Sequence, residues 1–471
     1  MKFDNTYIKL PSNFYKATLP TPCLMPELLA WNKDLAEKLG CLDSLNKTSD
    51  VIKYFSGNEI LPGSEPVSLI YAGHQFGNFV NQLGDGRAVL LGELIDSDTN
   101  RFDLQLKGSG RTPFSRDGDG RSAMGPVLRE YIISEAMFHL GIPTTRALAA
   151  IKTGELVIRD RPEPGAILTR VASSHIRFGT FEYFAVRGDK INLRKLLNYT
   201  IERHFPDLKE SSESTLDLFR RISVLQAELI SKWMGVGFVH GVMNTDNCLV
   251  SGETIDYGPC AFLDEFDFFK TFSSIDSSKR YAFGRQAQIA QWNLARLAAA
   301  FLVLGGVVEK YEEELENFQN LYEKNFLNVI GKKLGFSEIK KNDEEIISKW
   351  FEHLQKESLD YTLSFRHLAD QLNDKSPKKF GEFEDIWKIR INDQPDSLTE
   401  VKRKMNTLNP IFIPRNHQIE KAIKIALEGN LSGFNDLNTV LRKPFDKQPG
   451  MMSYAEAPVP TERVLKTFCG T

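Results

Sequence analysis

The chain has few of the features that mark exported, membrane-spanning or zinc-binding proteins. Its 471 residues include only five cysteines, which are widely scattered and show no metal-ligand spacing, so we expect reduced thiols and no zinc site. The longest apolar stretch, Leu297 to Val308, is too short to span a bilayer and predicts a buried helix. The N-terminus, MKFDNTYIKLPSNF, lacks an apolar signal core. We therefore expect no export and no membrane partner.

Neither sign of charge dominates the composition. The 59 basic and 62 acidic side chains leave a formal net charge of -3 and a pI near 6.3. A nucleic-acid-binding surface needs a strongly basic face, so we expect no nucleic-acid partner. A local basic site for a nucleotide is compatible with this net charge. With 41% hydrophobic residues and no internal repeat, the chain can bury a large core, and its length suggests two or three domains or lobes.

The most informative stretch is FVHGVMNTDNCLVSGETIDYG, from Phe238 to Gly258. A serine-glycine turn between two apolar runs predicts a β-hairpin that pairs Cys248–Val250 with Thr254–Ile255. Such a hairpin would hold Asn247 and Asp256 at neighbouring strand ends. One Mg²⁺ or Mn²⁺ could take an oxygen from each.

This stretch is similar to the catalytic and metal loops of protein-kinase-like enzymes, in which H-x-D-x-x-x-x-N is followed by D-F-G. The spacing from His240 to Asn247 fits that pattern. The position of the usual catalytic aspartate is Val242, and a carboxylate, Asp246, stands beside the asparagine instead.

Two segments upstream have the composition of a phosphate site. The turn Gly84-Asp85-Gly86-Arg87 precedes the apolar run Ala88–Leu91, and its backbone NH groups could face an anion, although a plain hairpin turn is the commoner use of such a sequence. Arg101–Lys107 alternates apolar and polar residues, which predicts a half-buried strand that ends on Lys107, pointing away from the core.

A long polar loop follows, GSGRTPFSRDGDGRSAMG, with five glycines and three arginines. A loop of this length is usually functional or mobile. The residues that could surround a polyphosphate are Arg111, Arg116, Asp119, Gly120 and Arg121. Pro126 then opens a predicted helix that ends before Gly141, with Glu130 at the edge of its apolar stripe. Glu130 is either the ion-pair partner that orients Lys107 on phosphate or a solvated surface residue.

Two further strands are expected, Glu155–Arg159 and Ala166–Ala172. Arg170 ends the second strand and Arg177 follows it, so both could bind phosphate through bidentate guanidinium contacts, or simply solubilise the surface. Helices are expected at the positions that carry helical periodicity, namely 26–39, 191–205, 215–235, 285–304 and most of 309–400.

The order of these pieces predicts an α+β, protein-kinase-like two-lobed fold with a β-rich N-lobe, a helical C-lobe and extra helical extensions at both ends. The expected boundaries are 1–75 for the N-terminal extension, 76–190 for the N-lobe, 191–320 for the C-lobe core, and 321–471 for the C-terminal extension and tail.

Across nearly the whole chain the sequence resembles the selenoprotein O family, protein adenylyltransferases built on a pseudokinase fold. The motifs that carry the resemblance are YAGHQFGNF, LGDGRA, LQLKGSGRTPFSRDGDGR, REYIISEAM, TRVASSHIRFGTFEYF, HGVMNTDN, IDYGP, IPRNH and FCGT. The resemblance implies that ATP binds in reversed orientation. AMP would then pass to Ser, Thr or Tyr hydroxyls of partner proteins, and self-modification is possible.

The resemblance also implies roles for individual residues. Asp246 would be the proton acceptor, Asn247 and Asp256 the ligands of Mg²⁺ or Mn²⁺, and Lys107 with Glu130 the phosphate-binding ion pair. The residues implied to bind ATP are Gly84, Gly86, Arg87, Lys107, Asp119, Gly120, Arg170, Arg177 and Asp256. The family implies the cytoplasm for a bacterial chain and mitochondria for a eukaryotic one.

One departure concerns the cysteines. Cys469 stands where animal members carry selenocysteine, and some bacterial members pair this cysteine with one in the activation segment. Here that segment, FLDEFDFFKTFSSIDSS, has none, and only Cys260 is close to it, so a redox pair of Cys260 and Cys469 is a hypothesis.

Two other functions remain open. The first is a kinase-like phosphotransferase that acts on a small molecule, against which Val242 argues. The second is a non-catalytic pseudokinase that binds nucleotide, against which the intact set of Lys107, Asn247 and Asp256 argues.

Overall fold

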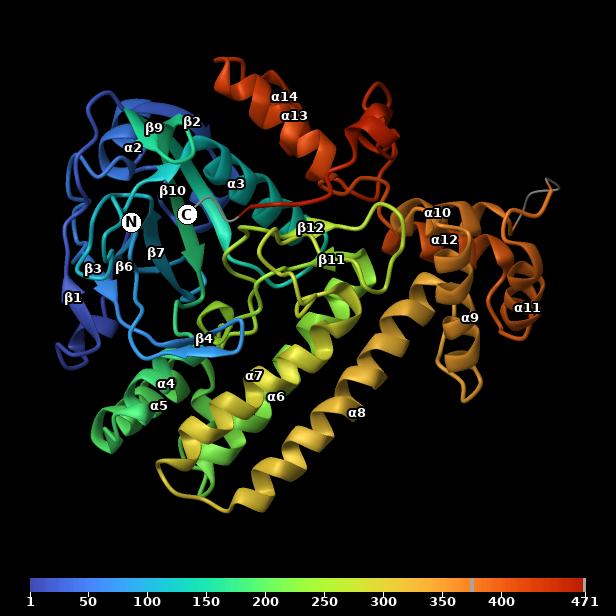
Figure 1. The fold of residues 1–471 in the computed structure, drawn as a ribbon, viewed down its shortest axis with the longest axis horizontal. Coiled ribbons are helices and arrows are strands. Elements are labelled where there is room, and N and C mark those ends of the chain that lie inside the picture. The colour runs from blue at the N-terminus through green and yellow to red at the C-terminus, as the bar shows by residue number, and fades with distance from the viewer. Residues whose placement is uncertain (373–376, 469–471) are drawn as a thin grey trace.

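The computed structural model describes residues 1–372 and 377–468. The protein is α+β, with most of its strands in the first 172 residues and mainly helices after them (Figure 1). Within the described ranges, no helix has the length and apolar character needed to cross a membrane.

One antiparallel sheet dominates the N-terminal part. Its strands follow each other in space as β1 (Tyr15–Ala17), β3 (Val67–Leu69), β6 (Ala88–Ile95), β7 (Arg101–Lys107), β10 (Pro162–Ala172), β9 (Arg146–Ile158) and β2 (Glu27–Trp31), and β8 (Ser122–Ala123) also pairs with β10. Two short pairs lie outside it, β4 (Gly73–Gln75) with β5 (Asn78–Val80), and β11 (Phe238–Val239) with β12 (Ala261–Phe262).

The sheet is buried on both faces. In β6, Val89 and Leu91 join one hydrophobic core together with α1 (Lys33–Lys38) and α2 (Thr48–Phe55), whereas Leu90 joins the larger core on the other face. Helix α3 (Met124–His139) contributes most of its side chains to that larger core and packs against β9 and β10.

The remaining chain is mainly helical. The helices are α4 (Phe178–Val186), α5 (Lys190–His204), α6 (Ser214–Val236), α7 (Gln286–Leu302), α8 (Val308–Lys333), α9 (Asp343–Lys356), α10 (Tyr361–Asp370), α11 (Gly381–Asn392), α12 (Leu398–Leu408), α13 (Asn416–Leu427) and α14 (Ser432–Leu441). In Figure 1, α6, α7 and α8 run side by side as the longest helices, and the red C-terminal chain returns toward the sheet.

Three local predictions are wrong. Residues 27–31 form β2 and not the start of a helix, because this apolar segment pairs with β9 at the sheet edge, and only α1 follows it. Cys248–Val250 does not pair with Thr254–Ile255. Leu249 instead bridges to Arg177, and Thr254 bridges to Thr144.

The third error concerns the polar face of β7, which was expected to be solvated. Asp103 and Gln105 are buried. Arg203 and His175 satisfy Asp103, and Asp85 satisfies Gln105. Alternation therefore located the strand correctly, but both of its faces pack against other elements.

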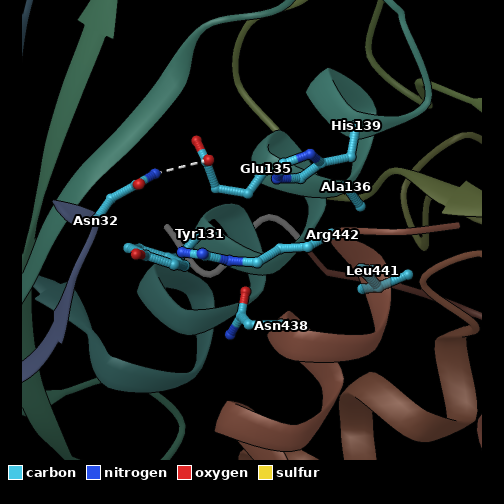
Figure 2. Close-up of a pocket in the computed structure, with 8 residues that line it drawn as sticks. All are labelled: Asn32, Tyr131, Glu135, Ala136, His139, Asn438, Leu441 and Arg442. Atoms are coloured by element: carbon cyan, nitrogen blue, oxygen red, sulfur yellow. Dashed lines mark hydrogen bonds between the residues drawn. The ribbon is translucent and has the colours of Figure 1, made fainter. Parts of the chain in front are cut away.

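The C-terminal helices α13 and α14 cover the outer face of α3. Tyr131 of α3 packs on Phe434 of α14 with ring centroids 5.6 Å apart, and Arg442 pairs with Asp34 at 2.7 Å. A small cavity of about 30 Å³ remains at this junction, where Glu135 accepts a hydrogen bond from Asn32 (Figure 2). This volume is about that of one water molecule, so the cavity is a packing defect and not a ligand site.

A buried arginine joins the C-terminal part to the segment after Gly258. Arg415 lies in the compact IPRNH motif and is fully buried. It donates to Asp264 at 2.8 Å, to Asp360 at 2.9 Å and to the backbone oxygen of Ala455 at 3.0 Å.

We predict that Arg415→Met lowers the free energy of unfolding by about 3 kcal/mol, because Asp264 and Asp360 lose the cation that compensates their burial. The thermal midpoint should fall by several degrees. The exposed pair of Arg403 with Glu400 provides the control, and Arg403→Met should change the midpoint little. Equal midpoints for the two variants would contradict the proposed role of Arg415.

Candidate functional site

A cleft of about 2140 Å³ is lined by residues of the sheet, α3, the 242–258 loops, α13 and the C-terminal tail. It exceeds the volume of a typical small-ligand pocket. The residues singled out in the sequence that line it are Gly84, Gly86, Arg87, Lys107, Asp119, Gly120, Arg121, Glu130, Arg170, Arg177, Asp246, Asn247 and Asp256.

Asp256 is the centre of the charge cluster in this cleft. Lys107 Nζ and Arg170 Nη2 each donate to its Oδ1 at 2.7 Å, and Arg177 Nη1 donates to its Oδ2 at 2.8 Å. Burial alone would raise the pKa of Asp256, but attraction to Arg170, Lys107 and Arg177 outweighs it and holds the pKa well below its usual range. Asp256 is therefore ionised at any physiological pH.

Glu130 shares two of these cations. Lys107 donates to its Oε2 at 2.7 Å, and Arg170 donates to its Oε1 at 2.5 Å. The ion pair expected from the sequence is present, but Glu130 is buried and does not lie at a solvated helix edge. Three cations thus face two carboxylates, and this local excess of positive charge favours an anionic ligand.

The backbone at Asp256 is strained, and neighbouring contacts hold it. Its φ of 64° lies in the left-handed region, which non-glycine residues rarely adopt. His240 Nε2 bonds the carbonyl oxygen of Ile255 at 2.9 Å, and Tyr257 bonds Thr144 through its hydroxyl. Burial lowers the pKa of His240, so the neutral ring acts as a structural donor that fixes the residue before Asp256.

Asp246 lies in the short 3-10 turn Thr245–Asn247, and the β4–β5 hairpin covers its carboxylate. Gln75 Nε2 donates to Oδ2 at 3.2 Å, while Oδ1 is buried without a hydrogen-bond partner among the described residues. A side-chain carbon at Gly73 would stand 2.8 Å from both Cβ and Cγ of Asp246. Burial raises the pKa of Asp246 to about 6. At neutral pH this carboxylate is mostly ionised and able to accept a proton.

The rest of the hairpin is tied to the same turn. The backbone NH of His74 donates to Thr245 Oγ1 at 2.7 Å, and the backbone NH of Phe76 donates to Asn244 Oδ1 at 3.1 Å. Tyr281 donates to the same Asn244 oxygen at 2.7 Å. Through these contacts, the segment YAGHQFGNF holds in place the turn that carries Asp246.

The sequence alone indicates no role for Gly73 or Gln75. The only signal was the density of glycine and aromatic residues in that segment, which does not identify the loop against which it packs.

The glycine turn and the polar loop form one unit. Phe114 covers Gly84, where a Cβ would stand 2.5 Å from its ring, and Thr112 Oγ1 donates to the carbonyl oxygen of Asp85 at 2.7 Å. Gly84 is therefore required by this close approach and by its φ of 138°.

Some charged residues of the polar loop line the cleft, and some bond to neighbouring parts of the protein. Asp119 lines the cleft but also pairs with Arg159 at 2.8 Å. Arg121 donates to the carbonyl oxygens of Thr21 and Pro22 and pairs with Glu155 at 3.0 Å. Arg121 also lines the cleft, so its expected role around a polyphosphate stays a prediction. Arg111 and Arg116 are not among the residues that line the cleft.

Asn247 and Asp256 both line the cleft, and their chemistry suits a hard divalent cation. The amide nitrogen of Asn247 donates to the carbonyl oxygen of Val242 at 2.9 Å, which makes its Oδ1 the atom able to face a cation. Residues 1–372 and 377–468 contain no group of three or more His, Cys, Asp or Glu side chains that could hold a metal ion. Mg²⁺ is typically bound by one or two carboxylates together with phosphate oxygens and water, so these residues fit a metal that arrives with a nucleotide.

The C-terminal tail lies along the cleft. Thr467 bridges to Ser273, and its hydroxyl donates to the carbonyl oxygen of Pro259. Cys260 is buried directly after this proline. Cys469 lies outside the described residues, so the redox pair of Cys260 and Cys469 stays a prediction.

Comparison with known proteins finds similarity over the whole chain. Residues 1–442 match the family model described as "Protein adenylyltransferase SelO". Proteins named "Protein nucleotidyltransferase YdiU" are similar over 100% of this chain: that of Rhizobium leguminosarum is 48% identical with 97% of its own length covered, that of Rhizobium etli 49% with 97%, and that of Bradyrhizobium diazoefficiens 47% with 99%.

We predict that Mn²⁺ alone binds this protein weakly. The cleft supplies one amide and one or two carboxylates, and the Asp256 carboxylate already binds three cations of the protein. Addition of ATP should tighten Mn²⁺ binding at least about tenfold beyond its affinity for free ATP, since phosphate oxygens complete the ligand set. Electron paramagnetic resonance titration measures both affinities. Asp256→Asn is the control variant, and tight Mn²⁺ binding without nucleotide would contradict the prediction.

Proposed function

Since the chain belongs to the SelO family of protein adenylyltransferases, we propose that it transfers AMP from ATP to Ser, Thr or Tyr hydroxyls of proteins and releases pyrophosphate. The observation that supports this most strongly is the position of the buried Asp246 and of the Lys107–Arg170–Arg177 cluster around Asp256 in one cleft. In this proposal Asp246 is the proton acceptor and the cluster is the polyphosphate site.

We propose a protein-kinase-like two-lobed fold for this protein. The lobes would be 76–190 and 191–320, with an N-terminal extension at 1–75 and a C-terminal extension and tail at 321–471. The antiparallel sheet, the buried Lys107–Glu130 pair and the helical remainder support this division.

The proposed reversed orientation of ATP is what membership of the family implies. Arg170 and Arg177 are buried cations that would bind the terminal phosphate, and Lys107 would bind phosphate oxygens while Glu130 orients it. Gly84, Gly86, Arg87, Asp119 and Gly120 would contact ATP along the loop side of the cleft. Asn247 and Asp256 would hold Mg²⁺ or Mn²⁺, which supplies neutralisation of phosphate charge.

In the proposed transfer, the hydroxyl oxygen of the acceptor bonds to the α-phosphorus, and the bond from that phosphorus to the oxygen of pyrophosphate breaks. The hydroxyl proton passes to the Asp246 carboxylate. Negative charge grows on the departing pyrophosphate, where Lys107 and the two arginines stabilise it. Gln75 and Gly73 keep the Asp246 carboxylate in place.

The alternative of a small-molecule phosphotransferase is less well supported. Val242, at the position of the kinase catalytic aspartate, is buried and apolar and cannot accept a proton. A non-catalytic pseudokinase is disfavoured by the complete set of ionised groups in the cleft. The bacterial relatives support a location in the cytoplasm.

The test uses ATP labelled at the α or the γ phosphate. We expect protein-bound label from the α position and none from the γ position, with a mass increase equal to AMP on the chain itself or on added protein. Asp256→Ala should abolish transfer, whereas Asp98→Ala, an exposed carboxylate away from the cleft, should leave it unchanged. Label from the γ position, or substantial activity of Asp256→Ala, would overturn the proposal.

A second prediction concerns Gly73. Gly73→Ala should reduce AMP transfer by about 100-fold, because the new methyl group displaces the Asp246 carboxylate by a fraction of an ångström or more. ATP binding, measured by calorimetry, should change little. Gly433→Ala, where the nearest atom is 3.7 Å away, is the matched control. Unchanged transfer in Gly73→Ala would show that the hairpin does not position Asp246.

A further inference from the structure

Beside the hairpin that supports Asp246, two arginines flank one tryptophan. The guanidinium carbon of Arg280 lies 4.7 Å from the ring centroid of Trp292, and that of Arg296 lies 5.1 Å from it. Trp292 and Arg296 belong to α7, and Arg280 precedes it. We call these three residues the arginine–tryptophan cluster. Stacking on a Trp face holds each guanidinium in place.

Neither arginine of the cluster has an ion-pair partner among the described residues. The Nε–H groups of both are buried and donate no hydrogen bond within the part of the chain that the structure describes. This differs from Arg170, which is compensated by two carboxylates, and from Arg187, which stacks on Tyr183 but is exposed to water. A half-buried guanidinium without a carboxylate is poorly compensated, so an anion from outside the chain would complete it.

The cluster adjoins the site through the hairpin. Gly77 approaches the Arg280 guanidinium, at 3.6 Å from the position of an added Cβ, and the rings of Phe76 and Tyr281 lie 5.1 Å apart. His74 meets Trp292 edge-on at 5.2 Å. Gln75, in the same hairpin, holds Asp246. A protein segment bound at these arginines would therefore also contact the hairpin that holds Asp246.

The surface has the composition of an interface centre. Phe79 at the hairpin end is 38% exposed, although it is a large apolar residue, and it packs on His74 at 4.8 Å. Tryptophan, arginine and aromatic residues dominate the energetically important contacts of protein interfaces.

We propose that the arginine–tryptophan cluster, together with Phe79, is the docking surface for the acceptor protein and selects segments with acidic side chains near the modified hydroxyl. This inference rests on the proposed function and names its substrate class. Arginine pairs with carboxylates through two parallel hydrogen bonds, which gives the surface its selectivity. An extended chain advances about 3.3 Å per residue, so four residues span about 13 Å, and the proposal takes the acidic residue to lie within about four positions of the hydroxyl.

The test compares two fluorescent serine peptides that bind the full chain in the presence of a non-hydrolysable ATP analogue. One carries glutamate at the second to fourth positions on both sides of the serine, and the other carries glutamine at the same positions. We expect the glutamate peptide to bind at least about tenfold more tightly in low salt, and the difference to shrink as salt increases.

Arg280→Gln combined with Arg296→Gln should remove that difference and leave ATP binding unchanged. Arg187→Gln, a stacked but exposed arginine, is the matched control and should keep it. Equal affinity of the two peptides for the unaltered chain, absence of binding by both, or a preference that survives in the double variant would overturn the docking surface. Binding is measured without turnover, so failure of AMP transfer, read from the α-labelled ATP, is a separate result.

Discussion

The compensation of Asp256 is the interaction on which the rest of the site depends. Its carboxylate joins a lysine from β7, an arginine from β10 and an arginine that precedes α4, and Glu130 of α3 shares two of these cations. Segments that are far apart in the sequence are thus fixed relative to one another by charge. The low-dielectric surroundings strengthen these attractions, and removal of any one member leaves its buried partners with less compensation.

A second layer of contacts holds the groups that react. The strained backbone at Asp256 is secured by His240 through Ile255, and Asp246 is secured by Gln75 and by the close approach of Gly73. The two carboxylates have opposite environments. Asp256 lies among cations, which lower its pKa, whereas burial raises that of Asp246. One is suited to hold charge and the other to accept a proton.

The sequence predicted much of this arrangement, and its errors have physical causes. The strand that ends at Lys107 and the helix that carries Glu130 were found because periodicity reports the face that a segment buries. The strands expected at 155–159 and 166–172 match only the end of β9 and the second part of β10. Periodicity does not report what covers the other face. Alternation therefore predicted that Asp103 and Gln105 are solvated, but both are buried. Residues 27–31 were predicted to be helical, but they form β2, which pairs with β9. Gln75 was missed because its partner, Asp246, is 171 residues away.

The position of α3 determines how the protein can be studied in pieces. Its inner face packs on β9 and β10, and its outer face is covered by α13 and α14, more than 270 residues later in the chain. A fragment that ended before α13 would leave the outer apolar surface of α3 open to water and prone to self-association. Glu130 lies on that same helix, so the sheet and the C-terminal helices form one cooperative unit. Biochemical experiments therefore need the intact chain.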